Sequence, residues 1–270
     1  MKHCFIAPTN YLHLIPKESK HHLLLAHLLE DKKYVEFYKK RKEEGDFIFL
    51  DNGAFEFKRP LMADELIRLV DKAGFAPDVI VAPDYPFEPW EKTVQSTEDF
   101  CKIYRKYFGD QTVVMAVPQS VKGDHEGWIQ SYNHLQNIED VWWIGMSILG
   151  IPNAFCSLTG TEDISFNRTF CTELLKKNHF IKPQNVRHHY LGCGDPRELL
   201  MMKAQGVANT NDSSTAFWHG IVGTTFDDSA SGLIKGKSPI EVDFNIDFEE
   251  SNVQRIRRNI DWINKLICSI

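Results

Sequence analysis

The sequence predicts an α/β fold, a (β/α)8 TIM barrel formed by residues 1–270 as one domain, with an N-terminal helical insertion and a C-terminal helix. Three observations predict it. Short apolar runs of β type recur along the chain, segments with helical spacing lie between most of them, and the runs are apolar throughout instead of alternating. Strands covered on both faces have that continuous apolar pattern, which is typical of parallel sheets in barrels or doubly wound sheets. A barrel of ~250 residues suits the length best.

Seven apolar runs are expected to form strands, at 4–7, 47–50, 79–82, 112–117, 141–148, 189–191 and 207–209. Helical spacing of apolar side chains predicts helices at 61–73, 97–108, 169–177 and 196–205. Asp195 followed by Pro196 fits the N-cap and first turn of the last of these. A helical hairpin is expected over 18–45, and the tail at 248–270 is expected to be a helix that closes the barrel.

Composition excludes several classes of protein. With 43% hydrophobic and 25% charged residues, the chain is neither disordered nor fibrous. Its longest apolar runs, such as 23–29, are far shorter than the ~20 residues of a membrane span, and its N-terminus lacks the apolar stretch of a signal peptide. Six scattered cysteines without a Cys-x-x-Cys pair predict reduced thiols and a cytoplasmic protein. The net charge of −6 means that nucleic-acid binding would need a local basic patch.

Polar residues or glycines follow or interrupt nearly every expected strand. Asp51, Asp84, Gln119 and Asp212 come directly after or shortly after apolar runs, and Gly145 lies within one. An aspartate after a strand is often only a turn former or a helix cap. In a (β/α)8 barrel, however, the carboxyl ends of all strands meet at one rim, which carries the active site. We therefore expect these residues to converge although they lie far apart in the sequence.

Four segments in the same order resemble motifs of the tRNA-guanine transglycosylases. Residues 51–56 (DNGAFE) resemble their DSGGFQ segment, and 116–119 (AVPQ) resemble their GIVQ segment. Residues 191–196 (LGCGDP) look like their MGVGxP turn, and 206–212 look like the strand that delivers their catalytic aspartate. These enzymes are (β/α)8 barrels that exchange guanine for a 7-deazaguanine base. A related subfamily, encoded by phages and bacterial genomic islands, acts on DNA.

The resemblance implies a role for each candidate residue. Asp212 would be the nucleophile that captures the anomeric carbon, and Asp51 the acid/base near the leaving guanine. Asp84 and Gln119 would hydrogen-bond the edge of the base, with backbone contacts from Gly145 and Met146. The residue types suit the chemistry, because breaking an N-glycosidic bond develops positive charge on the sugar that a carboxylate can capture.

One departure from the family bears on the substrate. The tRNA enzymes carry a Cys-x-Cys-x-x-Cys zinc cluster near the C-terminus, whereas here only Cys268 lies beyond Cys193. We therefore expect the acceptor to be DNA, the incoming base to be a free deazapurine such as preQ0, and the location to be the host cytoplasm if the chain is phage-encoded. Base exchange needs no redox or nucleotide cofactor, and the His188-His189 pair fits no standard zinc spacing. A tRNA-acting transglycosylase, an N-glycosidase of the same fold and a non-catalytic nucleic-acid-binding barrel remain alternatives.

A basic run is the candidate for contact with phosphates. It consists of Lys39, Lys40, Arg41 and Lys42. Such a run is either a solvated helix face or a phosphate-binding patch, and an acidic protein that binds DNA needs the latter. A base inside a duplex cannot reach a barrel mouth, so its nucleotide would have to be flipped out or the duplex melted.

Overall fold

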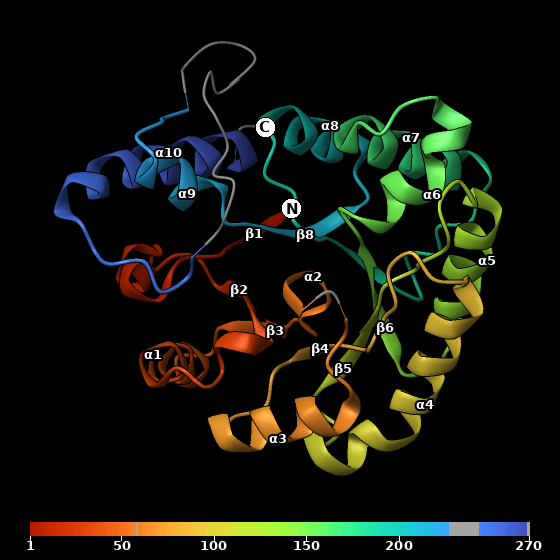
Figure 1. Cartoon of the computed structure of the whole chain (residues 1–270), viewed down its shortest axis with the longest axis horizontal. Coiled ribbons are helices and arrows are strands. Elements are labelled where there is room, and N and C mark those ends of the chain that lie inside the picture. Colours follow the sequence, from red (N-terminus) through yellow and green to blue (C-terminus); the bar gives the residue numbers. More distant parts are fainter. Residues whose placement is uncertain (58, 227–242, 269–270) are drawn as a thin grey trace.

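The computed structural model describes residues 1–57, 59–226 and 243–268, and it confirms the predicted (β/α)8 TIM barrel (Figure 1). Eight parallel strands alternate with helices in a nearly closed barrel. The hydrogen-bonded order of the strands is β1-β8-β7-β6-β5-β4-β3-β2. The two strands at the ends of this order, β1 and β2, also lie next to each other. Because all strands run in parallel, their carboxyl ends form a single rim.

The strands are short and their apolar side chains are buried on both faces of the sheet, as in other parallel sheets. They are β1 (Lys2–Phe5), β2 (His21–Leu24), β3 (Phe47–Leu50), β4 (Val79–Val81), β5 (Val113–Ala116), β6 (Val141–Met146), β7 (Arg187–Tyr190) and β8 (Ala208–Ser213). The last strand is longer than the apolar run at 207–209 predicted. Asn211 and Asp212 therefore lie within β8 and pair with β1, where Asp212 is in register with Cys4.

Helices cover the outside of the barrel. Those longer than one turn are α1 (Lys32–Glu43), α3 (Ala63–Ala73), α4 (Trp90–Phe108), α5 (His125–Leu135), α6 (Gly150–Thr159), α7 (Ile164–Lys177), α8 (Pro196–Gln205), α9 (Thr215–Ile221) and α10 (Glu250–Cys268). One-turn α2 (Ala54–Phe57) and the 3-10 segments η1 (Thr9–Leu14) and η2 (Ala26–Leu28) complete the described elements. Asp195 caps α8 by accepting the Arg197 N–H at 2.8 Å, and Pro196 occupies its first position, as predicted.

The predicted helical hairpin over 18–45 is wrong, and with it the N-terminal helical insertion. Residues His21–Leu24 form β2, which pairs with β3, so α1 is the ordinary connection between two barrel strands. The two histidines made this run look unlike a buried strand. His22 is nevertheless fully buried, and its Nε2 atom lies 3.0 Å from Asp46 Oδ2, which gives this nitrogen of the ring a hydrogen-bond partner.

The C-terminal helix closes the barrel as predicted. α10 packs along α9, and its buried Ile256 lies so close to Gly220 that a Cβ there would approach Ile256 Cγ1 to 2.5 Å. Asn259 of α10 donates to the carbonyl oxygens of Ala216 and Thr224. Among the described helices, none is long and apolar enough to cross a membrane.

Candidate active site

The carboxyl rim of the barrel gathers the polar residues that the sequence singled out. Asp51 follows β3, Asp84 follows β4, Gln119 follows β5, and Asp212 lies near the end of β8. Asp84, Gln119 and Asp212 are nearly inaccessible to solvent, and Asp51 is half-buried. Parallel strands with continuous apolar runs are what bring these side chains, distant in sequence, to one end of the molecule.

Asp212 is held through one of its two carboxylate oxygens. His189 Nε2 donates to Oδ1 at 2.9 Å, and the Gly192 backbone N–H donates to the same oxygen at 3.0 Å. The other ring nitrogen of His189, Nδ1, lies 2.6 Å from the Thr210 hydroxyl, which fixes the orientation of the ring. Within the described part of the chain, no donor contacts Oδ2. The carboxylate is therefore oriented by one oxygen while the other is available to attack an electrophile.

Asp84 accepts hydrogen bonds from two side-chain amides. Asn52 Nδ2 donates to its Oδ1 and Gln119 Nε2 donates to its Oδ2, both at 2.6 Å. Asn52 Nδ2 also lies 2.7 Å from the carbonyl oxygen of Ala82. Burial raises the pKa of Asp84 from 3.8 to about 6, although the two amide donors oppose this shift. The carboxyl group is therefore mainly ionised at neutral pH, and each oxygen keeps a lone pair for a ligand.

The surroundings of Asp51 favour its neutral form. Burial raises the pKa of Asp51 well above its usual value, and the negative charges of Glu56, Asp84 and Asp212 raise it further. The Gly53 N–H, which lies 3.2 Å from Oδ2, opposes this shift. Asp84 and Asp212 thus lie near enough to act on Asp51, and the three aspartates share one rim of the barrel. A carboxyl group whose pKa is raised can act as a general acid.

Two glycines allow close packing at the rim near Gln119. A Cβ on Gly150, at the start of α6, would lie 2.3 Å from Gln119 Oε1. A Cβ on Gly145 in β6 would lie 2.8 Å from Val117 Cγ2. The adjacent Met146 carbonyl already accepts from the Leu191 N–H at 3.2 Å and from an arginine side chain at 3.0 Å. Gly145 and Met146 thus lie at the rim, and their contact with a base stays a prediction.

The prediction that the whole basic run at the end of α1 contacts phosphates is wrong for Arg41. Arg41 is buried and its Nε lies 2.7 Å from Asp46 Oδ2, so it cannot reach a phosphate. Lys42 is paired with Asp78 at 2.7 Å. Both aspartates directly precede strands, which places this part of α1 at the amino rim, opposite the candidate site. The other two residues of the run are exposed, and their contact with nucleic acid stays a prediction.

Two functional candidates were missed by the sequence-based prediction. Asn52 lies in the DNGAFE segment but was given no role of its own, and His189 was considered only as part of a histidine pair without zinc spacing. The signal for His189 was its place in a predicted barrel strand, three residues before Gly192. Among the described residues, no group of three or more His, Cys, Asp or Glu side chains has the arrangement of a metal site.

Two cavities are lined by residues other than the three aspartates. One, of about 370 Å³, lies between α3 and α4 and is lined in part by Pro83, Tyr85 and Lys92. The other, of about 420 Å³, is lined by residues of α7 and α8 and of the segment before α7. At the candidate site itself, the amides that would contact a ligand bind Asp84 instead.

No protein-family model and no curated protein matches the chain.

Proposed function

We propose that this protein is a base-exchange transglycosylase that replaces guanine in DNA with a 7-deazaguanine base, such as preQ0, through a covalent aspartyl-sugar intermediate. The observation that carries the proposal is the division of roles among three neighbouring carboxyl groups. Asp212 is held through one oxygen, the pKa of Asp51 is raised by burial and by nearby negative charges, and Asp84, with a pKa of about 6, lies between two amide donors. A nucleophile, an acid and an acceptor for base N–H groups are the parts that this reaction needs.

In the first half of the reaction, Asp212 Oδ2 attacks C1′ of the target nucleotide while the bond from C1′ to guanine N9 breaks. The leaving guanine takes the proton of Asp51, so neutral guanine departs and Asp51 becomes ionised. His189 and Gly192 keep Oδ1 in place and prevent the carboxylate from rotating as charge moves to the new ester.

The second half reverses these steps with a different base. N9 of the incoming deazaguanine attacks C1′, its N9 proton passes to Asp51, and the ester to Asp212 breaks. Both aspartates return to their starting states, and one glycosidic bond has replaced another. Atoms and electrons balance without an oxidant, a reductant or an energy source.

Recognition of the base follows from Asp84 and Gln119. The free lone pairs of an ionised Asp84 accept from the N1–H and 2-amino group of guanine, while the second amide hydrogen of Gln119 is available for the O6 carbonyl. Deazaguanines keep these groups, whereas adenine lacks the N1–H and the O6 acceptor. A site of buried polar groups rejects a base that leaves them unpaired by large factors.

The test is incubation of the purified protein with single-stranded and duplex DNA and labelled guanine or preQ0. Incorporation by the wild type is expected, with loss of at least about a hundredfold in Asp212→Asn. Asp78→Asn is the matched control, since Asp78 accepts the Ile48 N–H at 2.8 Å and directly precedes β4, at the opposite rim of the barrel. Undiminished incorporation by Asp212→Asn contradicts the proposal.

Other outcomes identify the alternatives. Incorporation into tRNA but not into DNA indicates a tRNA-guanine transglycosylase. Release of guanine without incorporation indicates an N-glycosidase. Binding of DNA with neither reaction indicates a non-catalytic nucleic-acid-binding barrel.

A further inference from the structure

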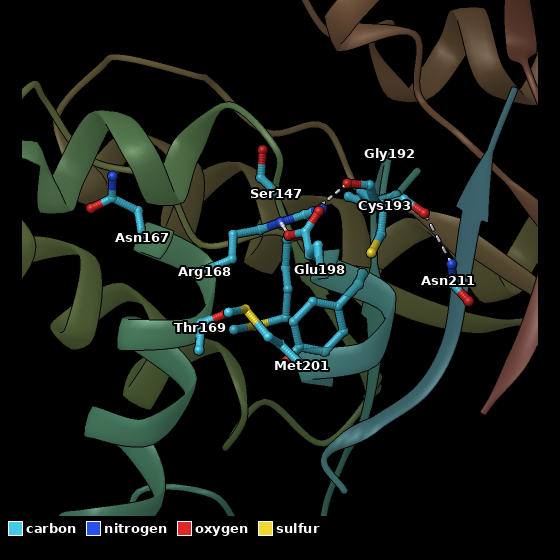
Figure 2. Close-up of polar contacts among 12 residues, drawn as sticks. Ser147, Asn167, Arg168, Thr169, Gly192, Cys193, Glu198, Met201 and Asn211 are labelled. Carbon is cyan, nitrogen blue, oxygen red and sulfur yellow. Dashed lines mark hydrogen bonds and ion pairs between the residues drawn. The ribbon is translucent and has the colours of Figure 1, made fainter. Parts of the chain in front are cut away.

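A fully buried arginine lies directly behind the turn that holds Asp212. Arg168 of α7 has no solvent exposure, and its Nε donates to Glu198 Oε1 of α8 at 2.5 Å (Figure 2). Its Nη1 donates to two backbone carbonyl oxygens at the carboxyl ends of neighbouring strands. These are the carbonyl oxygen of Met146, the last residue of β6, at 3.0 Å, and that of Leu191, the first residue after β7, at 2.5 Å.

The second of these carbonyls belongs to the peptide group that contacts Asp212. The C=O of Leu191 and the N–H of Gly192 are part of one planar unit, so an interaction that fixes one also fixes the direction of the other. Arg168 holds the oxygen end of this peptide, and the nitrogen end donates to Asp212 Oδ1 at 3.0 Å. The positive charge on the carbonyl side also polarises the peptide and strengthens its N–H as a donor.

The turn itself depends on external support. Gly192 has φ of 68°, in the left-handed region, and a Cβ there would crowd Ile148 at 3.2 Å. On its far side, the Cys193 carbonyl accepts from Asn211 Nδ2 at 3.2 Å, directly before Asp212 in the sequence (Figure 2). Arg168 on one side and Asn211 on the other therefore determine the orientation of the turn.

We infer that Arg168 is a positioning residue for the nucleophile. It holds the Leu191–Gly192 peptide so that the Gly192 N–H orients Asp212 for attack, and this role rests on the proposed function. A buried ion pair can instead serve stability alone, and the chain contains such a pair in Arg41 and Asp46. The carbonyls that Arg41 contacts belong to Pro16 and Ser19, which lie away from the carboxyl rim.

These two pairs form a matched experiment. Arg168→Met/Glu198→Gln and Arg41→Met/Asp46→Asn each remove both charges of one buried pair, which avoids leaving a single buried charge. We expect kcat for base exchange to fall about a hundredfold in the first variant with KM for the free base within about threefold of wild type, because a misplaced nucleophile slows the chemical step. The second variant should keep its kcat even where its melting temperature falls equally.

A second readout does not depend on activity. Hydrogen exchange of the Gly192 amide should be about tenfold faster in the Arg168 variant than in the wild type, and unchanged in the Arg41 variant. If Arg168→Met/Glu198→Gln does not fold, Arg168→Lys replaces it, since lysine keeps the charge but cannot span both carbonyls.

Unchanged protection of the Gly192 amide, or an unchanged kcat in a folded Arg168 variant, overturns the inference. Failure of the proposed function is a separate result. It would appear as absence of base exchange in the wild type, while the amide measurement still shows whether Arg168 controls the turn.

Discussion

Replacing His189 with leucine isolates the hydrogen bond that orients the proposed nucleophile. His189 Nε2 donates to Asp212 Oδ1 at 2.9 Å in a fully buried setting. A hydrogen bond to a charged group contributes about 1.5–3 kcal/mol. If that energy serves to position the carboxylate in the transition state, its loss lowers kcat by about 10- to 150-fold, since ~1.4 kcal/mol corresponds to a tenfold change in rate. The Gly192 N–H remains, so activity should be reduced and not abolished.

The neighbouring histidine supplies the control. His188 is equally buried, but it points to the other face of β7, where its Nε2 shares a hydrogen bond of 2.9 Å with the Tyr132 hydroxyl. His188→Leu should cost about 0.5–1.5 kcal/mol in the free energy of unfolding and leave kcat unchanged. The assay is steady-state incorporation of labelled guanine at saturating base, with urea unfolding of each variant. A folded His189→Leu protein whose kcat lies within about threefold of wild type refutes the reasoning.

Three further predictions address the base site and the acid. Gly150→Ala places a Cβ 2.3 Å from Gln119 Oε1, so KM for the incoming base should rise about tenfold with little change in kcat, as measured by titration with base. Because the folded pKa of Asp84 is about 6 against 3.8, the folded state binds more protons than the unfolded state between these values, and stability falls as pH rises through this range. Asp84→Asn should remove that loss of about 3 kcal/mol, seen by urea unfolding at pH 4 and pH 7; equal pH dependence of both proteins contradicts the assignment. Asp51→Asn should lower kcat about 10²- to 10⁴-fold and abolish the fall in rate that the wild type shows when rising pH ionises Asp51.

The barrel was predictable because its strands are short, apolar throughout and separated by helical segments. The strand that was missed, β2, has two histidines in four residues, and only tertiary contacts explain their burial. His22 becomes compatible with a buried strand through Asp46 and Arg41, which are 19 to 24 residues away. No local pattern contains that information.

The placement of the candidate residues at one rim was predictable from the sequence, but their hydrogen bonds were not. Aspartates at the ends of apolar runs are visible in the sequence, and the fold brings them to one rim. Which oxygen of Asp212 is clamped depends on the register between β7 and β8, where a shift occurs after His188. The sequence does not distinguish Arg41, within its basic run, from a solvated arginine. Nor does the sequence show that Arg168, a polar residue on a helix, contacts two backbone carbonyls of the rim.

Trapping of the covalent intermediate tests the central claim most directly. The protein is incubated with guanine-containing DNA, denatured in acid and digested with protease and nuclease, and its peptides are measured by mass spectrometry. The account predicts a deoxyribosyl adduct on the peptide that contains Asp212 in the wild type and none in Asp212→Asn. Base exchange that proceeds with an unmodified Asp212 peptide, or with the adduct on another residue, would contradict it.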